Sequence, residues 1–143
     1  MAKLNPYLNL KGKCREAMGF YKEIFGGELS LMTFADSPMA AQVPAEMQDN
    51  IVHAFLDGDV KLMGTDMEGG PEGISYGNTI VLCLNCDSVD ELQTLFSHLA
   101  TDGQVEMAPK KEFWGGTFAA LSDQYGIKWM LEHSEPQPET KAA

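Results

Sequence analysis

The chain contains two copies of one structural unit, and this repetition constrains its fold more than any other feature. An amphipathic stretch from Ala17 ends at Gly26-Gly27 and is followed by strand-like segments and the tight turn Asp57-Gly58-Asp59. The second half has the same order, with an amphipathic stretch over Leu92–Leu99 and the turn Asp123-Gln124-Tyr125-Gly126. Because each unit would expose one apolar sheet face, the two faces must be buried against each other or against a second chain. The repetition therefore predicts a concave small-molecule site between the units.

The spacing of apolar residues predicts two helices among short strands. Residues 14–25 carry apolar side chains at i, i+3, i+4, i+7 and i+11, which makes one helix face that ends at the glycine pair. Ser88-Val89-Asp90-Glu91 fits a capping box at the start of the second helix. The resulting order, β-α-β-β-β twice, predicts an α+β fold of two tandem βαβββ modules. We expect the first module over residues 1–66, a linker over 67–77, the second module over 78–133, and a disordered tail over 134–143.

Composition narrows the classes of partner. The 143 residues are 44% hydrophobic and 22% charged, and their net charge of −11 opposes binding to a phosphate backbone. No run approaches the roughly 20 apolar residues of a membrane span, and the N-terminal residues have no apolar signal core. We therefore expect no nucleic-acid partner, no membrane partner and a cytoplasmic location.

The three cysteines favour structural thiols over a disulfide framework, because three cannot all pair within one chain. Cys83 and Cys86 have the spacing of a redox motif or a zinc knuckle. However, residues three apart on a strand point to opposite faces, and a zinc knuckle needs a second pair of ligands that the sequence lacks.

Several short motifs, by their order and spacing, resemble those of one superfamily. They are Asn5-Pro6-Tyr7-Leu8, Phe20-Tyr21-Lys22-Glu23-Ile24-Phe25-Gly26, Phe113-Trp114-Gly115 and the stretch from Ser122 to Met130. On these motifs the chain resembles the vicinal-oxygen-chelate superfamily of glyoxalases, extradiol dioxygenases and bleomycin- or fosfomycin-resistance proteins, and within it the PhnB-like branch. The resemblance covers nearly the whole chain before the tail. It implies the glyoxalase/bleomycin resistance fold, with curled mixed sheets, commonly assembled as a homodimer.

The resemblance also identifies where a metal would lie in the superfamily's enzymes. They hold a divalent ion with His, Gln or Glu from the first and last strands of each module, and the ion stabilises an enolate or binds oxygen. In this sequence the last-strand positions fall on Met63 and Met130, whose thioethers are poor ligands for hard divalent ions. The first-strand positions fall near Asn5 or Pro6 and near Thr79 or Ile80. We therefore expect no metal site of the superfamily type and no cofactor.

His53 and Glu132 keep a catalytic alternative open. His53 shares a strand face with Ile51 and Phe55, and Glu132 lies two positions beyond Met130 and so shares its face. The alternative is a metal-assisted lyase, isomerase or dioxygenase with His53 as base or ligand and Glu132 as ligand or acid–base partner. A strand histidine bonded to a neighbour and a solvated glutamate would explain the same two residues without catalysis.

Six large side chains are predicted to line the cavity. They are Tyr7, Met63, Phe113, Trp114, Trp129 and Met130. Aromatic rings with a polar tip and flexible methionines suit an apolar pocket that adapts to its guest, although core packing explains such residues equally well. The function we expect is binding of a small apolar or aromatic molecule without turnover, and whether the protein is an enzyme stays open. An interaction subunit with a vestigial cavity is the third alternative.

Two activities attached to the PhnB-like branch lack support in these residues. Some relatives carry a methyltransferase label tied to ubiquinone synthesis, but the chain has no glycine-rich strand-to-helix loop to hold a nucleotide-like cofactor. A phosphonate site should show convergent Arg or Lys, and the only arginine is Arg15 on the first predicted helix.

Overall fold

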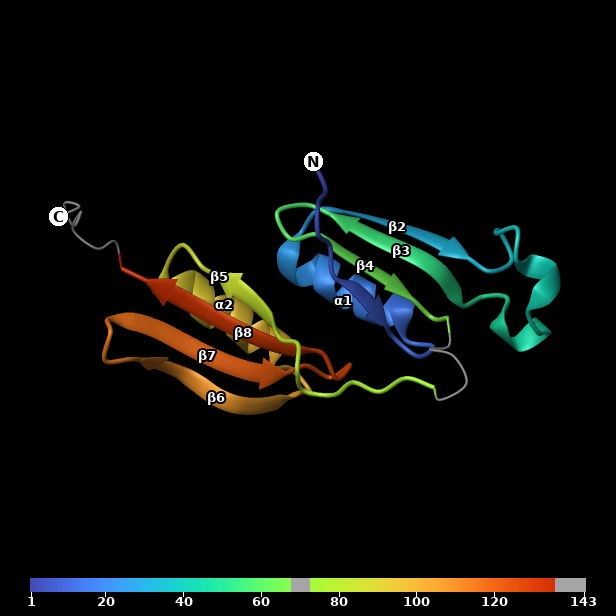
Figure 1. Ribbon diagram of the computed structural model, residues 1–143. Coiled ribbons are helices and arrows are strands. Elements are labelled where there is room, and N and C mark those ends of the chain that lie inside the picture. Colours follow the sequence, from blue (N-terminus) through green and yellow to red (C-terminus); the bar gives the residue numbers. More distant parts are fainter. Residues whose placement is uncertain (68–72, 136–143) are drawn as a thin grey trace. The chain divides into compact units, whose positions relative to one another are not determined.

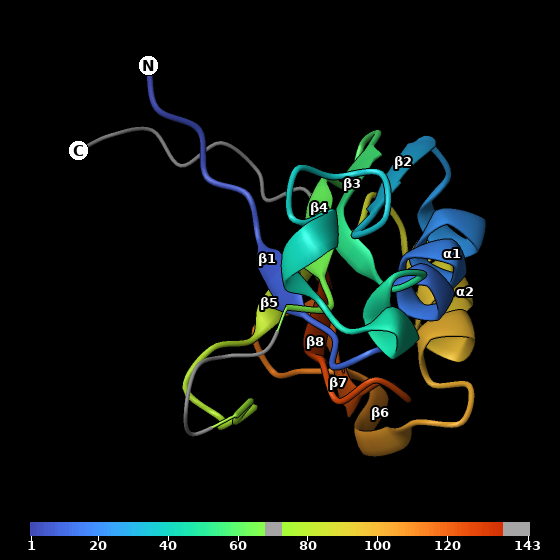
Figure 2. The same ribbon diagram turned by 90° about the vertical axis from the view of Figure 1, so that its right-hand side faces the viewer.

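A computed structural model describes residues 1–67 and 73–135, and the chain divides into two compact units, residues 1–75 and 76–143. The division falls within the predicted linker, of which residues 68–72 lie outside the described part. Each unit is one four-stranded mixed sheet with a helix on one face (Figure 1, Figure 2). The predicted α+β fold of two tandem modules is confirmed.

The first module has a sheet in the strand order β1-β4-β3-β2. Strand β1 runs parallel to β4, and the other neighbours are antiparallel. Its elements are β1 (Tyr7–Asn9), α1 (Cys14–Phe25), β2 (Glu28–Thr33), 3-10 turns at Ala40–Gln42 and Ala45–Met47, β3 (Ile51–Asp57) and β4 (Leu62–Thr65).

The second module repeats this topology in the order β5-β8-β7-β6, again with one parallel pair, β5 with β8. Its elements are β5 (Leu82–Asn85), α2 (Val89–Leu99), β6 (Gln104–Lys111), β7 (Gly116–Ser122) and β8 (Lys128–Ser134). Strand β5 begins only at Leu82, where its pairing with β8 starts, and Ile80 before it is 78% exposed. Strand β8 extends to Ser134, the first residue of the predicted tail, and residues 136–143 lie outside the described part.

The two helices begin in different ways. Helix α2 starts with the predicted cap, since the Ser88 hydroxyl accepts from Glu91 N and the Glu91 carboxylate accepts from Asp87 N. Helix α1 has no cap from a neighbouring side chain. Its first amide, Cys14 N, instead donates to the buried carboxylate of Asp66, 52 residues away.

In each module a glycine after the helix lets the chain pass close to the backbone at the end of a strand. Helix α1 ends at Gly26 and Gly27, both with positive φ. A Cβ on Gly27 would lie 2.6 Å from the carbonyl oxygen of Asp57, and one on Gly103 would lie 2.4 Å from that of Ser122. The repeat is therefore present in the packing as well as in the order of elements. Within the described residues, no helix is long and apolar enough to cross a membrane.

Candidate functional site

Each module leaves open the sheet face opposite its helix. In β8 the side chains alternate, so that Trp129 and Leu131 are buried, Met130 is half-buried and Glu132 is exposed. The buried set packs on the helix side, and the other set forms what we call the open face of the module. These two open faces carry most of the residues that the sequence analysis singled out, and we describe each by itself.

The open face of the first module brings together Tyr7, His53 and Met63. Met63 lies between its cross-strand partners Tyr7 and Phe55, and His53 pairs with Met32. The rings of Tyr7 and His53 stack with their centroids 6.1 Å apart. Tyr7 and Met32 are 48% and 47% exposed. The face is therefore an aromatic and thioether surface with one imidazole.

The open face of the second module has an apolar row and a polar row. In the apolar row Met130 lies between Cys83 and Ala120, and Met107 follows on β6. In the next row Glu132 pairs with Asn85 on one side and Phe118 on the other, and Lys110 lies beyond Phe118. Met130 and Glu132 thus share a face, as predicted from their spacing.

A compact polar cluster flanks the apolar row on its other side. Lys128 Nζ lies 2.9 Å from Glu106 Oε1 and 3.3 Å from Ser122 Oγ, and the Ser122 hydroxyl also donates to Glu106 over 2.9 Å. These hydrogen bonds, first from Lys128 and then from Ser122, hold the pKa of the Glu106 carboxyl below its usual value. The two charges of this cluster therefore neutralise each other.

The prediction that Trp129 lines the cavity is wrong. Its side chain is 1% exposed and faces α2, and its indole Nε1 donates to Asp123 Oδ2 over 2.9 Å. Adjacent strand residues point to opposite faces, so Trp129 cannot share the open face with Met130. Trp129 belongs to the core of its module.

Phe113 and Trp114 lie in the connection between β6 and β7, close to each other and largely exposed. Their rings meet edge to face at 4.9 Å, and Phe113 is 95% exposed. A Cβ on Gly116 would lie 2.7 Å from the indole Nε1 of Trp114, so a larger residue at this position would displace the ring.

The cysteines are all free, and they differ in accessibility. Burial first, and then the Asp66 charge, raises the pKa of Cys14 to about 12. Burial first, and then Glu91, raises the pKa of Cys86 to about 11. Cys83 is exposed on the open face. The two buried groups therefore stay as thiols near neutral pH, as the structural interpretation expects.

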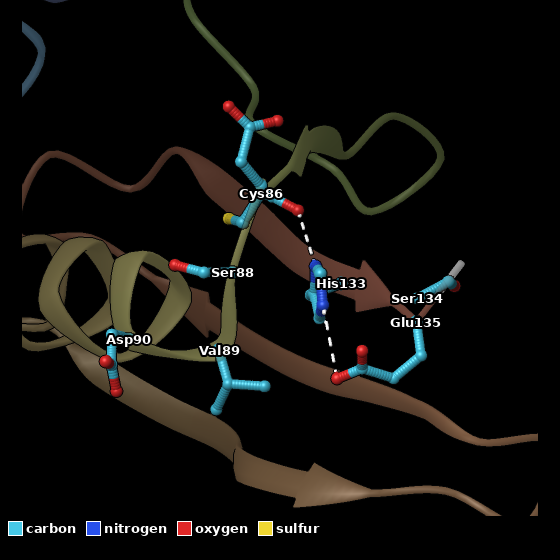
Figure 3. A pocket seen from close by; sticks show the side chains of 8 residues that line it. Cys86, Ser88, Val89, Asp90, His133, Ser134 and Glu135 are labelled. Carbon is cyan, nitrogen blue, oxygen red and sulfur yellow. Dashed lines mark hydrogen bonds and ion pairs between the residues drawn. The ribbon is translucent and has the colours of Figure 1, made fainter.

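A pocket of about 500 Å³ lies outside the open faces, where α2 begins and β8 ends (Figure 3). It is lined by Cys86, Asp87, Ser88, Val89, Asp90, His133, Ser134 and Glu135. The His133 side chain is 11% exposed, with Nδ1 2.9 Å from Cys86 O and Nε2 3.5 Å from Glu135 Oε1. The sequence analysis missed this pocket, since it joins residues 47 apart and no local motif marks it.

Comparisons with known proteins agree with this architecture. The Glyoxalase/Bleomycin resistance protein/Dioxygenase superfamily profile matches residues 3–131. The chain belongs to this superfamily. Protein YjdN of Escherichia coli (strain K12) is 30% identical, with 94% of this chain and 97% of YjdN covered.

Two solved structures extend the comparison. Protein PA1353 from Pseudomonas aeruginosa is 34% identical with a TM-score of 0.79, covering 94% of this chain and 98% of its own. The PhnB protein from Bacillus cereus is 23% identical with a TM-score of 0.72, covering 93% and 100%. At this identity the likeness is one of fold.

The superfamily's metal chemistry can be compared with the donors within each module. Among the described residues, no three His, Cys, Asp or Glu side chains gather as a metal would need. Met63 and Met130 lie on the open faces but offer only thioethers, and His53 and Glu132 lie in different modules. The donors within one module therefore do not fit a divalent ion. A site using both His53 and Glu132 stays a prediction, as does the cavity between the modules.

Proposed function

We propose that this superfamily member binds a small apolar or aromatic molecule on the open faces of its modules. The observation that carries the proposal is the surface around Met63, where Tyr7, Phe55 and Met32 present apolar atoms on the side of the sheet away from α1. Apolar surface left in water costs about 25 cal/mol per Å², and contiguous patches of it mark binding surfaces. Covering this face with a ligand would recover that free energy.

The chemistry of the face favours an adaptable fit. Thioether side chains are flexible and polarisable, and they make favourable contacts with aromatic rings. The hydroxyl of Tyr7 and the imidazole of His53 supply polar atoms beside the apolar surface, which would orient a guest. Such a surface would hold a ring system or a branched apolar group better than a strongly hydrated one.

A matched pair of substitutions tests the proposal. Met32 and Leu31 are neighbours on β2, 47% and 38% exposed, and they point to opposite faces of the sheet. Met32→Glu should weaken binding of the neutral dye Nile red, followed by its fluorescence, whereas Leu31→Glu should leave it unchanged. Equal binding by both variants, with folding verified by circular dichroism, would contradict the proposal. Untargeted mass spectrometry of molecules that copurify with the native protein would then identify the guest.

The assembly we propose is a homodimer, as the resemblance to the superfamily implies. Sedimentation equilibrium at several protein concentrations tests this directly. A single species of 15.7 kDa, the mass of one chain, would contradict it.

The position of His53 favours a second candidate function, metal-assisted catalysis with His53 and Glu132. His53 is half-buried on the open face, with its ring against Tyr7, as a base or a metal ligand would be. Incubation with Ni, Mn, Fe and Zn followed by elemental analysis should then find a stoichiometric ion that His53→Ala removes. Retention of the ion by His53→Ala would exclude His53 from the site.

A further inference from the structure

The carboxylate of Glu132 is the feature of the second open face that packing does not explain. Glu132 is exposed in the middle of a four-stranded row, between Asn85 and Phe118. No side chain of residues 1–67 or 73–135 forms a hydrogen bond or an ion pair with it. An unpaired charge therefore lies beside an aromatic ring and the thioether of Met130.

The internal repeat shows that the fold does not require this charge. Asn85 pairs with Glu132 as Asn9 pairs with Thr65, so Glu132 and Thr65 occupy the same position in the two modules. Thr65 is 1% exposed, and its hydroxyl donates to the carbonyl of Val52. The same backbone position thus accepts a neutral, internally satisfied residue.

Other charges on this face do not neutralise Glu132. Glu106 and Lys128 pair with each other, as described above. Lys110 lies on β6, two strands from β8 and across Phe118. At the usual strand spacing the backbones of Lys110 and Glu132 are therefore about 10 Å apart. Burial first, and then the charge of Glu132, raises the pKa of the Cys83 thiol. The charge of Glu132 therefore acts on the apolar row, to which Cys83 belongs.

From this arrangement we infer that the ligand of the second open face is an organic cation, a protonated amine with an apolar or aromatic body. Its ammonium group pairs with Glu132 and lies at the Phe118 ring, and its body covers Met130 and Ala120. Carboxylates and aromatic faces both attract ammonium groups, and each such contact at a partly exposed site strengthens binding about threefold. The inference rests on the proposed function and adds the charge of the guest.

Three naphthalene probes of equal bulk test the charge: 1-naphthylmethylamine, 1-naphthalenemethanol and 1-naphthaleneacetate, titrated calorimetrically at pH 7. The amine should bind roughly tenfold more tightly than the alcohol, from the two contacts together, and the carboxylate should bind most weakly because Glu132 repels it. Glu132→Gln should reduce the preference for the amine over the alcohol to about threefold, which is what the Phe118 ring alone supplies. Met130→Ala should weaken all three, since it removes shared apolar contact.

The net charge of −11 would attract any cation, so a control with the same charge is needed. Glu23, exposed on α1, removes one negative charge away from the open faces when replaced as Glu23→Gln. This variant should keep the preference for the amine. Equal binding of all three probes to the native protein, or a preference that Glu132→Gln leaves unchanged, would overturn the inference and leave the proposed function standing. Absence of binding by all three probes would overturn both.

Discussion

Asp66 is predicted to be a principal support of the first module. Its carboxylate is 4% exposed and accepts two backbone hydrogen bonds, from Cys14 N and from Ile51 N, both over 2.8 Å. It therefore joins the end of β4 to the first turn of α1 and to the start of β3. Asp66→Ala would leave two buried N–H groups without an acceptor.

The cost of this substitution follows from the two bonds. Hydrogen bonds to a charged group contribute about 1.5–3 kcal/mol each, so Asp66→Ala should lower the free energy of unfolding by about 3–6 kcal/mol. That is a large part of the roughly 5–15 kcal/mol of a typical domain. Asp36→Ala is the control, because Asp36 is exposed and its carboxylate accepts a hydrogen bond from the nearby Thr33 hydroxyl.

Urea unfolding can assign the loss to one module. Both tryptophans, Trp114 and Trp129, lie in the second module, so tryptophan fluorescence reports that module while far-UV circular dichroism reports both. Asp66→Ala should move the circular dichroism transition to lower urea by more than it moves the fluorescence transition. A loss under about 1 kcal/mol would refute the reasoning, since it is less than one such bond contributes.

Three further predictions concern the cysteines and two side-chain contacts of the second module. Ellman's reagent should modify Cys83 in the native protein and the other two thiols only after unfolding; three fast thiols in the native state would contradict their burial. The lowered pKa of Glu106 stabilises the fold above the carboxyl's unfolded pKa, and this contribution is lost as the pH falls through the folded value. Lys128→Met should therefore raise the pKa of Glu106 in an NMR titration, and an unchanged value would exclude the pairing. Trp129→Phe should destabilise by about 2–3 kcal/mol through its lost hydrogen bond and volume, against about 0.5 kcal/mol or less for Trp114→Phe, as measured by urea unfolding.

The sequence by itself determined the order of elements, the two helices and the repeat. These features depend on local signals: apolar spacing places the buried stripe of α1, Gly26 and Gly27 end it, and Ser88 with Glu91 begins α2. Local signals act over a few residues, so they can be read along the chain.

Only the tertiary structure decided which side of each strand meets a helix and which distant groups meet. Period-two alternation shows that Trp129 and Met130 face apart, but the position of α2 decides that Trp129 is the buried one. Cys14 and Asp66 are likewise joined across 52 residues, and His133 and Cys86 across 47. Such pairs depend on how the whole sheet is assembled, and the free energy of burying one face selects them where no short motif does.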